Sequence, residues 1–402
     1  MSYNELDFSR RNIVFALSEV KDMFRMHFER GCSYVAKGIL EKVMAADFEG
    51  FVGAGRYVRR DGRRGYRNGY RHRRLVTTVG TIELAVPRDR EAAWQPEVFE
   101  RYKRVEPVVD ATIRSMFLNG VSTRKVGDIL DILCGSRLSA SYVSKVTKEL
   151  DSAVQAFANR PIEDDFIFLF LDAISVRIRV ELHVKRYMLL VAYGIRSNGT
   201  RELMGFQKVK SESAGNWRAF LNNLEVRGLS GRMLKLIIMD GAAGLWAAVE
   251  EIYPLIPHQL CWVHKLRNVA RHCPKRYRQE CTGQAARIMY ATSSAIAARQ
   301  FRQWRDRWQN QAPKALRCLE KDFDKLIPFF EFPQQIRKLI RTTNVIERAF
   351  REVRRRLKIM GYFQNAASCR RIVYALFNYF NHKWHRNNEI IKTIKHMIQK
   401  AA

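Results

Sequence analysis

Two carboxylates each follow a stretch that the sequence marks as a buried strand. Asp172 comes directly after six apolar residues, 166–171, and Asp240 comes after the largely apolar segment 234–239. Short apolar runs rich in aromatic and branched residues are typical of strands buried on both faces. Two neighbouring strands that each deliver an Asp would place oxygen ligands side by side, as a pair of divalent metals needs. The alternative is that each Asp only caps the turn after its strand.

A third carboxylate, Glu347, lies in the basic segment 341–358. Apolar residues recur there at helical spacing and leave Glu347 at the border of the buried stripe. Basic neighbours keep a carboxylate ionised and able to bind a metal. The alternative is structural, because Asn344 and Glu347 have the spacing of a capping box. We expect the basic residues of this helix to contact phosphates: Arg348, Arg351, Arg354, Arg355, Arg356 and Lys358.

Cys261 and His264 have the spacing of a pair of metal ligands. A zinc site could be completed by the later residues His272, Cys273 and Cys281. Those three residues form no second pair motif, so zinc is the weaker interpretation. The chain between Asp240 and Cys261 has room for one helix and one short strand, which would return the pair to the sheet edge that holds the carboxylates. We therefore expect Cys261 and His264 beside the active site.

The elements expected around these residues form a mixed α/β arrangement. Strand-like alternation in 166–181, 187–194 and 202–209 predicts an antiparallel meander. A helix over 214–225, the Asp240 strand, a helix over 245–252 and a short strand near Leu260 follow. This is the element order of the ribonuclease H fold. We predict a catalytic core in 161–266, an all-helical insertion in 267–336 and C-terminal core helices in 337–402.

The N-terminal third has a different character. Segment 1–50 reads as a packing or dimerising pair of helices with an apolar face that includes Val35, Ile39 and Met44. Segment 51–105 combines a basic arm with a small β segment around Gly80. The arm, 56–74, holds nine Arg against one acid and is interleaved with Tyr and Gly. This composition suits a flexible arm that lies along phosphates and stacks on bases; a solvated charged loop is the alternative. The expected contacts are Arg56, Arg59, Arg60, Arg63, Arg64, Arg67 and Arg71.

Segment 106–155 has the layout of a helix-turn-helix DNA-binding domain. One helix opens at Ser122, a break follows at Gly135, and another helix opens at Ser139. Generic packing of three helices is the alternative. The residues expected to contact DNA are Ser122, Arg124, Lys125, Ser139, Ser141, Tyr142 and Lys145.

Composition points to a polyanionic partner. The 402 residues include 71 Lys and Arg against 40 Asp and Glu, so the net charge is +31. A membrane partner is not expected, because the sequence has neither an apolar run of about 18 residues nor a signal pattern. Seven scattered Cys argue against a secreted disulfide framework. We expect a cytoplasmic protein.

Several motifs together resemble the Mutator-related bacterial insertion-sequence transposases, over roughly residues 30–385. The motifs are Y-R-N-G-Y, V-P-R-D-R, G-V-S-T-R-K, M-D-G at Asp240, C-W-V-H at Cys261 and T-T-N-V-I-E-R at Glu347, followed by R-R-R-L-K and G-Y-F. The resemblance implies a DDE-type transposase with Asp172, Asp240 and Glu347 as its triad. It also implies that Cys261 and His264 belong to the active-site neighbourhood.

The expected activity is phosphodiester transfer with two Mg²⁺ ions, for which Mn²⁺ could substitute. Water as nucleophile would nick the element's ends, and the freed 3′-hydroxyl would join them to target DNA. The expected partners are transposon ends and target DNA. We expect a homodimer on paired ends and association with the bacterial nucleoid. The alternatives are a cellular nuclease of the same fold and a DNA-binding regulator derived from a transposase.

Overall fold

The computed structural model describes residues 10–58, 61–96 and 104–385. The chain divides into two compact units, with the boundary between Lys148 and Glu149. That boundary falls inside the segment 106–155 that we expected to be one domain, because the helix α5 (Leu150–Asn159) belongs to the second unit. The six segments expected from the sequence are finer than this division and remain predictions.

The N-terminal segment forms one helix, α1 (Arg10–Val52), and the expectation of a helix pair was wrong. Its buried stripe is Met44, Phe48 and Val52, which packs on a β-hairpin instead of on a second helix. Val35 and Ile39, expected on the buried face, are exposed. Met44 was expected on the buried face and is buried, so the prediction held only at the end of the helix that packs on the hairpin. Residues four apart on a helix share one face, and the hairpin extends the stripe from Met44 to Phe48 and Val52.

The hairpin consists of β1 (Arg67–Thr77) and β2 (Gly80–Asp89), which pair antiparallel. Thr77 pairs with Gly80, whose φ of 113° suits the tight turn between the strands. We expected strand only from Leu75 to Val86, around the turn at Gly80. The arginine-rich residues from Arg67 onward are strand rather than flexible arm, because an antiparallel pair can bury one face and leave the other to charged side chains.

Three short helices complete the first unit and match the expected layout. They are α2 (Pro107–Leu118), α3 (Thr123–Cys134) and α4 (Ala140–Lys148). Ser122 caps α3 by accepting a hydrogen bond from the Lys125 backbone N–H, and Gly135 ends it with a φ of 59°. Ile113, Val126 and Val143 pack together at the centre of the three helices.

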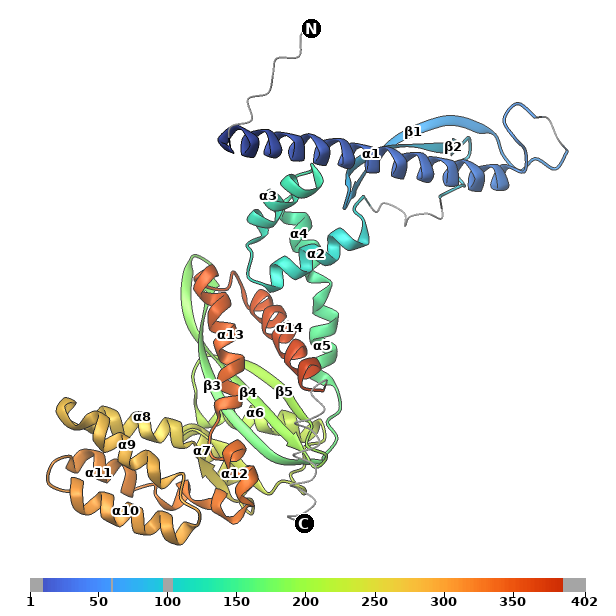
Figure 1. The fold of residues 1–402 in the computed structure, drawn as a ribbon. Coiled ribbons are helices and arrows are strands. Elements are labelled where there is room, and N and C mark those ends of the chain that lie inside the picture. The colour runs from blue at the N-terminus through green and yellow to red at the C-terminus, as the bar shows by residue number, and fades with distance from the viewer. Residues whose placement is uncertain (1–9, 59–60, 97–103, 386–402) are drawn as a thin grey trace. The chain divides into compact units, whose positions relative to one another are not determined.

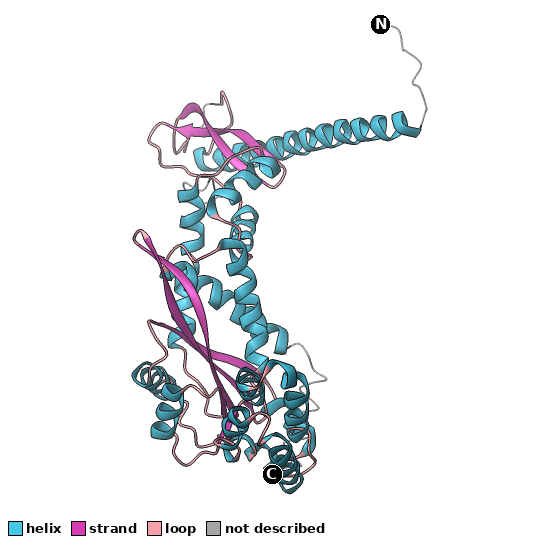
Figure 2. Cartoon of the chain, turned by 90° about the vertical axis from the view of Figure 1, so that its left-hand side faces the viewer, coloured by secondary structure: helices cyan, strands magenta, loops and turns pink. Residues whose placement is uncertain are grey.

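The second unit is built on one mixed sheet, shown with its surrounding helices in Figures 1 and 2. Its strands are β3 (Phe166–Val180), β4 (His183–Arg196), β5 (Arg201–Val209), β6 (Leu236–Met239) and β7 (His258–Leu260). The strand order is β5-β4-β3-β6-β7. The first three strands are antiparallel, and β6 and β7 run parallel to β3. The expected meander and the expected order of elements are both observed.

Helices cover both faces of this sheet. On one face, α6 (Ala214–Val226) and α7 (Ala243–Ile252) bury Trp217 and Leu245 against Leu171. The other face carries α5, α13 (Asn344–Met360) and α14 (Ala366–His385). Phe206 of β5 stacks on Phe157 of α5 and makes an edge-to-face contact with Phe377 of α14. Because side chains alternate along a strand, Phe170 and Asp172 point to the face opposite Leu171.

The segment between β7 and α13 is helical, as expected for the insertion. Its elements are α8 (Trp262–His272), α9 (Arg278–Ile288), α10 (Ser294–Trp308), α11 (Pro313–Glu320) and α12 (Gln334–Ile340), with short 3₁₀ turns at Lys275–Tyr277, Asp324–Leu326 and Pro328–Glu331. The Trp262 indole N–H donates to the Leu326 carbonyl over 2.7 Å and fastens the insertion to the end of β7. Among all the helices described, none is long and apolar enough to cross a membrane.

Candidate active site

The two Asp lie at the same level on neighbouring parallel strands. Leu171 of β3 pairs with Met239 of β6, so Asp172 and Asp240 are the next residues on adjacent strands. Met239 also pairs with Leu260 of β7, which puts Cys261 at that level on the third strand. Neighbouring strands are about 4.8 Å apart. The register therefore brings together three residues that are far apart in the sequence.

Asp172 is a buried carboxylate with one unsatisfied oxygen. The residue is 4% exposed, and its Oδ1 accepts the Ala173 N–H over 2.8 Å. Its Oδ2 is buried and has no hydrogen-bond partner. Burial raises the pKa of Asp172 to about 7; the negative charge of Asp240 adds to this rise and His264 opposes it. A buried acceptor without a donor is unfavourable, and a cation would satisfy it.

Asp240 is half-buried, and its Oδ1 accepts the Ala242 N–H over 3.0 Å. This is the turn-capping contact that formed the alternative interpretation of each Asp. One oxygen of each Asp is used in this local way. Turn capping does not explain the buried, unpaired Oδ2 of Asp172. Capping alone therefore does not account for the two Asp side chains.

Glu347 does not form the capping box that its spacing allowed. The residue before α13 is Thr343, and no side chain caps that helix. The Glu347 carboxylate instead accepts two hydrogen bonds from Arg267, at 2.7 and 3.3 Å, and lies 3.7 Å from His264 Nε2. Burial acts to raise the pKa of Glu347, but Arg267 outweighs it and the net shift is downward. Glu347 is therefore held ionised by an arginine.

Cys261 and His264 lie beside the carboxylates, as expected. The Cys261 sulfur is buried and accepts hydrogen bonds from the Thr343 N–H and hydroxyl, at 3.3 and 3.4 Å. This contact ties the end of β7 to the residue before α13 and so positions Glu347. Burial raises the pKa of Cys261, which keeps the thiol protonated. The Nδ1 atom of His264 is buried without a hydrogen-bond partner.

In the part of the chain that is described, no three His, Cys, Asp or Glu side chains are close enough together to hold a metal ion. The possible zinc ligands around Cys261 therefore do not form such a group. The three carboxylates do not form one either, and Glu347 is bound to Arg267. The donors of Asp172 and Asp240 nevertheless fit a hard cation, because they are carboxylate oxygens side by side and one of them is buried and unpaired.

The structure adds Glu212, which we did not expect from the sequence. It lies just before α6, whose N-cap is Ser213, and its Oε1 accepts the indole N–H of Trp217 over 3.3 Å. Burial raises the pKa of Glu212 to about 7; Asp240 adds to the rise and His264 opposes it. The only local signal in the sequence is an acid directly before a helix. An acid at that position commonly stabilises the positive end of the helix dipole, so it does not by itself indicate a functional residue.

The basic residues of α13 divide into two groups. Arg348, Arg351, Arg354, Arg355 and Lys358 are exposed. Arg356 is half-buried and forms an ion pair with Glu352, so its expected phosphate contact is not supported. Arg351, Arg354 and Lys358 follow Glu347 at helical spacing and lie on its side of the helix.

The expected DNA-contact residues of the helix-turn-helix segment also divide. Arg124, Lys125, Ser141 and Lys145 are exposed. Ser122 and Ser139 accept backbone N–H groups at the starts of α3 and α4. The Tyr142 hydroxyl donates to Asp110 over 2.9 Å and links α4 to α2, so this residue has a packing role that we did not expect.

The basic arm is fastened along much of its length. Three of its arginines donate hydrogen bonds to backbone carbonyls: Arg63 to Gly65 over 2.7 Å, Arg64 to Gly50 over 3.1 Å and Arg67 to Ala54 over 2.8 Å. Arg56 is exposed over the Tyr57 ring. The expected contacts Arg59 and Arg60 lie outside the described residues. The expectation of a flexible arm was wrong for Arg63, Arg64 and Arg67, because backbone carbonyls hold their side chains.

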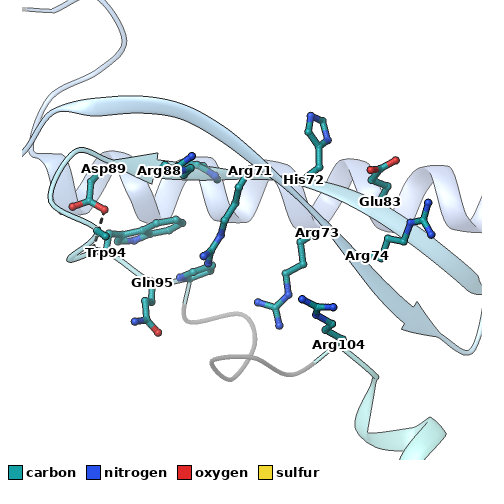
Figure 3. A pocket seen from close by; sticks show the side chains of 13 residues that line it. Arg71, His72, Arg73, Arg74, Glu83, Arg88, Asp89, Trp94, Gln95 and Arg104 are labelled. Atoms are coloured by element: carbon teal, nitrogen blue, oxygen red, sulfur yellow. Dashed lines mark hydrogen bonds between the residues drawn. The ribbon is translucent and has the colours of Figure 1, made fainter. Parts of the chain in front are cut away.

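A basic groove of about 690 Å³ lies on the hairpin; its lining includes Arg71, Arg73, Arg88 and Arg104. Figure 3 shows the guanidinium groups of Arg73 and Arg104 side by side. Burial lowers the pKa of Arg73, and the charges of Arg71 and Arg104 lower it further. Two acids, Glu83 and Asp89, also line the groove, but they are outnumbered by its arginines, and the Asp89 carboxylate accepts the N–H groups of Ala93 and Trp94. The groove is therefore a concentration of positive charge.

Comparison with known proteins places the chain in a family. The model for the family "Transposase, Mutator family" matches residues 13–387. The chain is 36% identical to the transposase for insertion sequence element ISRM5 of Rhizobium meliloti (strain 1021), over 94% of both chains. It is 34% identical to the transposase for IS256 in transposon Tn4001 of Staphylococcus aureus, over 87% of this chain and 91% of that one. It is 33% identical to the transposase for IS1081 of Mycobacterium tuberculosis (strain ATCC 25618 / H37Rv), over 85% of this chain and 82% of that one. The buried carboxylates and the groove of arginines suit a protein that acts on DNA. Because the family model and these relatives match most of the sequence, the chain belongs to the Mutator family of transposases.

Proposed function

We propose that the second unit cleaves DNA at the ends of an insertion sequence and joins the ends to target DNA, using Asp172, Asp240 and Glu347. The observation that carries this proposal is the register that sets Asp172 beside Asp240, together with the unpaired Oδ2 of Asp172. The strand order and the position of the two Asp are those expected of a ribonuclease H-like fold. Membership of a transposase family supports the same activity.

Asp172, Asp240 and Glu347 would hold two Mg²⁺ ions, or Mn²⁺, through carboxylate oxygens. When bound, such ions stabilise charge on the attacking and leaving oxygens of a phosphodiester. Asp172 and Asp240 supply oxygens from adjacent strands. Glu347 is bound to Arg267, so it would have to exchange that partner for the metal. Cys261 would keep Glu347 in reach through its contact with Thr343.

DNA would be held by both units. On α13, Arg351, Arg354 and Lys358 would contact phosphates near the reacting bond, because they lie on the same side of the helix as Glu347. In the first unit, the basic groove and the exposed residues of α3 and α4 would bind the element's ends. Water would act as nucleophile in nicking, and the freed 3′-hydroxyl in joining. We propose that a homodimer on paired ends does this on DNA of the nucleoid.

The test uses the full chain with a labelled duplex from the ends of the insertion sequence that encodes it. Asp172→Asn, Asp240→Asn and Glu347→Gln should each lower Mg²⁺-dependent cleavage and joining by about a thousandfold or more, because a metal ligand loses its charge. Binding to the end DNA should stay within about twofold. Glu251→Gln is the matched control, since Glu251 is exposed and pairs with Arg218. Full cleavage by Glu347→Gln would remove Glu347 from the triad, and full cleavage by all three variants would overturn the proposal.

A further inference from the structure

Glu212 is held in place by contacts that have no part in the proposed triad. Its Oε1 accepts the Trp217 indole N–H, and Trp217 is fully buried. A buried indole has few ways to move, so this hydrogen bond limits the positions that the Glu212 carboxylate can take. Ser213, the next residue, caps α6 through the Asn216 N–H. The carboxylate is therefore positioned by a fixed helix start.

The chain that carries Glu212 packs directly against the chain that follows Asp240. A Cβ added to Gly244, near the start of α7, would meet three backbone atoms. It would lie 2.8 Å from the Ala214 nitrogen, 2.9 Å from the Ser213 carbonyl carbon and 3.0 Å from the Glu212 carbonyl oxygen. Real side-chain carbons do not approach backbone so closely, so only glycine allows this contact. The starts of α6 and α7 are thereby joined, and Glu212 is brought toward Asp240.

Glu212 shares its electrostatic surroundings with the carboxylate site. Asp240 and His264 both act on it, and the same two residues act on Asp172. His264 in turn lies 3.7 Å from Glu347. Three carboxylates from separate elements, those of Asp172, Glu212 and Glu347, thus have His264 as a common neighbour. A second observation points to a ligand among them: the Oδ2 atom of Asp172 is buried and has no hydrogen-bond partner.

We propose that Glu212 is a fourth carboxylate of the metal site, binding the cation held by Asp240 either directly or through one bound water, with Trp217 as the residue that positions it. This inference rests on the proposed function, because it needs a divalent cation at Asp172 and Asp240. It adds a ligand that lies outside the triad. The competing role is structural, since an acid before α6 would also stabilise the positive end of that helix.

The experiment measures Mn²⁺ binding to the full chain without DNA, by electron paramagnetic resonance of the free ion. Glu212→Gln keeps the shape of the side chain and removes its charge, and it should weaken Mn²⁺ binding by about tenfold to a hundredfold. Glu212→Asp should recover part of that loss, because a carboxylate is restored. Glu251→Gln, on the exposed side of α7, should bind like the wild type.

Thermal unfolding separates the two roles of Glu212. Without metal, Glu212→Gln should have an unchanged or higher Tm, because a negative charge near Asp240 is removed, and Mn²⁺ should raise that Tm less than in the wild type. A lower metal-free Tm with wild-type Mn²⁺ affinity would assign Glu212 to the helix and overturn this inference alone. A wild-type chain that binds no Mn²⁺ would overturn both this inference and the metal-dependent function.

Discussion

The carboxylate site of the second unit gathers acidic side chains and the basic groove of the first unit gathers arginines, but in different surroundings. Asp172 is almost fully buried, and its pKa rises to about 7 chiefly because of burial. Arg73 in the groove is half-exposed, and its pKa is lowered by burial and by its neighbours Arg71 and Arg104. In each region the fold holds together groups that repel one another, and a ligand of opposite charge would relieve the repulsion.

The difference in burial indicates what each region can bind. Water and salt screen charges in an open groove, so contacts there are individually weak and depend on ionic strength. A buried carboxylate is screened much less and interacts strongly with a few close charges. The groove is therefore suited to a run of phosphates, and the carboxylate site to a small number of tightly held cations. Three predictions test this contrast, beginning with the largest effect.

Removing the groove's charges should weaken DNA binding steeply. In a combined Arg71→Ala, Arg73→Ala and Arg104→Ala variant, the slope of log affinity against log salt should fall by roughly three, near 0.9 per lost phosphate contact. At about 0.1 M salt this corresponds to a loss of roughly two to three orders of magnitude. The control replaces Arg278, Arg299 and Arg302, which are exposed in the helical insertion. Equal slopes for the wild type and the groove variant would show that the groove does not bind phosphates.

The carboxylate site should make the metal-free protein less stable as pH rises. The pKa of Asp172 is about 7 in the folded protein and near 3.8 in the unfolded chain. Between these values the folded protein keeps a proton that the unfolded chain has released, so stability falls as pH rises and the loss is complete above about 7. The loss should be on the order of 4 kcal/mol, at about 1.4 kcal/mol per pKa unit.

The measurement is Tm against pH in EDTA for the wild type and Asp172→Asn. The wild type should lose several degrees between pH 4.5 and 7.5 relative to the variant, at about 2–4 °C per kcal/mol. Mn²⁺ should remove that difference, because a bound cation favours the ionised carboxylate. Parallel Tm curves for the two proteins would mean that Asp172 ionises normally in the folded state.

The smallest expected effect concerns the contact between the starts of α6 and α7. Gly244→Ala should destabilise the protein by about 1–3 kcal/mol, because the new methyl group would meet backbone at 2.8 Å. It should also weaken Mn²⁺ binding by moving Glu212 away from Asp240. Gly215→Ala, also in this region, is the matched control: no atom lies near its added methyl, and it should stabilise α6 by up to about 1 kcal/mol. Equal Tm values for both variants would contradict the close packing at Gly244.

Elements with strong local patterns could be predicted from the sequence. The apolar run before Asp172, the strand alternation after it and the serine at the start of α3 are local features, and each determines its element through side-chain period or capping. The sequence likewise marked Asp172, Asp240 and Glu347 as candidate ligands, from two buried strands and one basic helix. It failed at α1, where the apolar residues allowed more than one stripe and the hairpin decided which stripe is buried.

Only the tertiary structure decided which charges meet. The register of β3, β6 and β7 sets Asp172 and Asp240 at one level with Cys261, whose sulfur holds the start of α13. Packing of Gly244 joins the starts of α6 and α7, and Arg267 of α8 reaches Glu347. These partners lie tens of residues apart in the chain, and a single charged residue has no periodic pattern that reveals its partner. Burial and long-range electrostatics depend on the complete packing, so the sequence identified the candidate triad, and the fold determined the neighbours of these three residues.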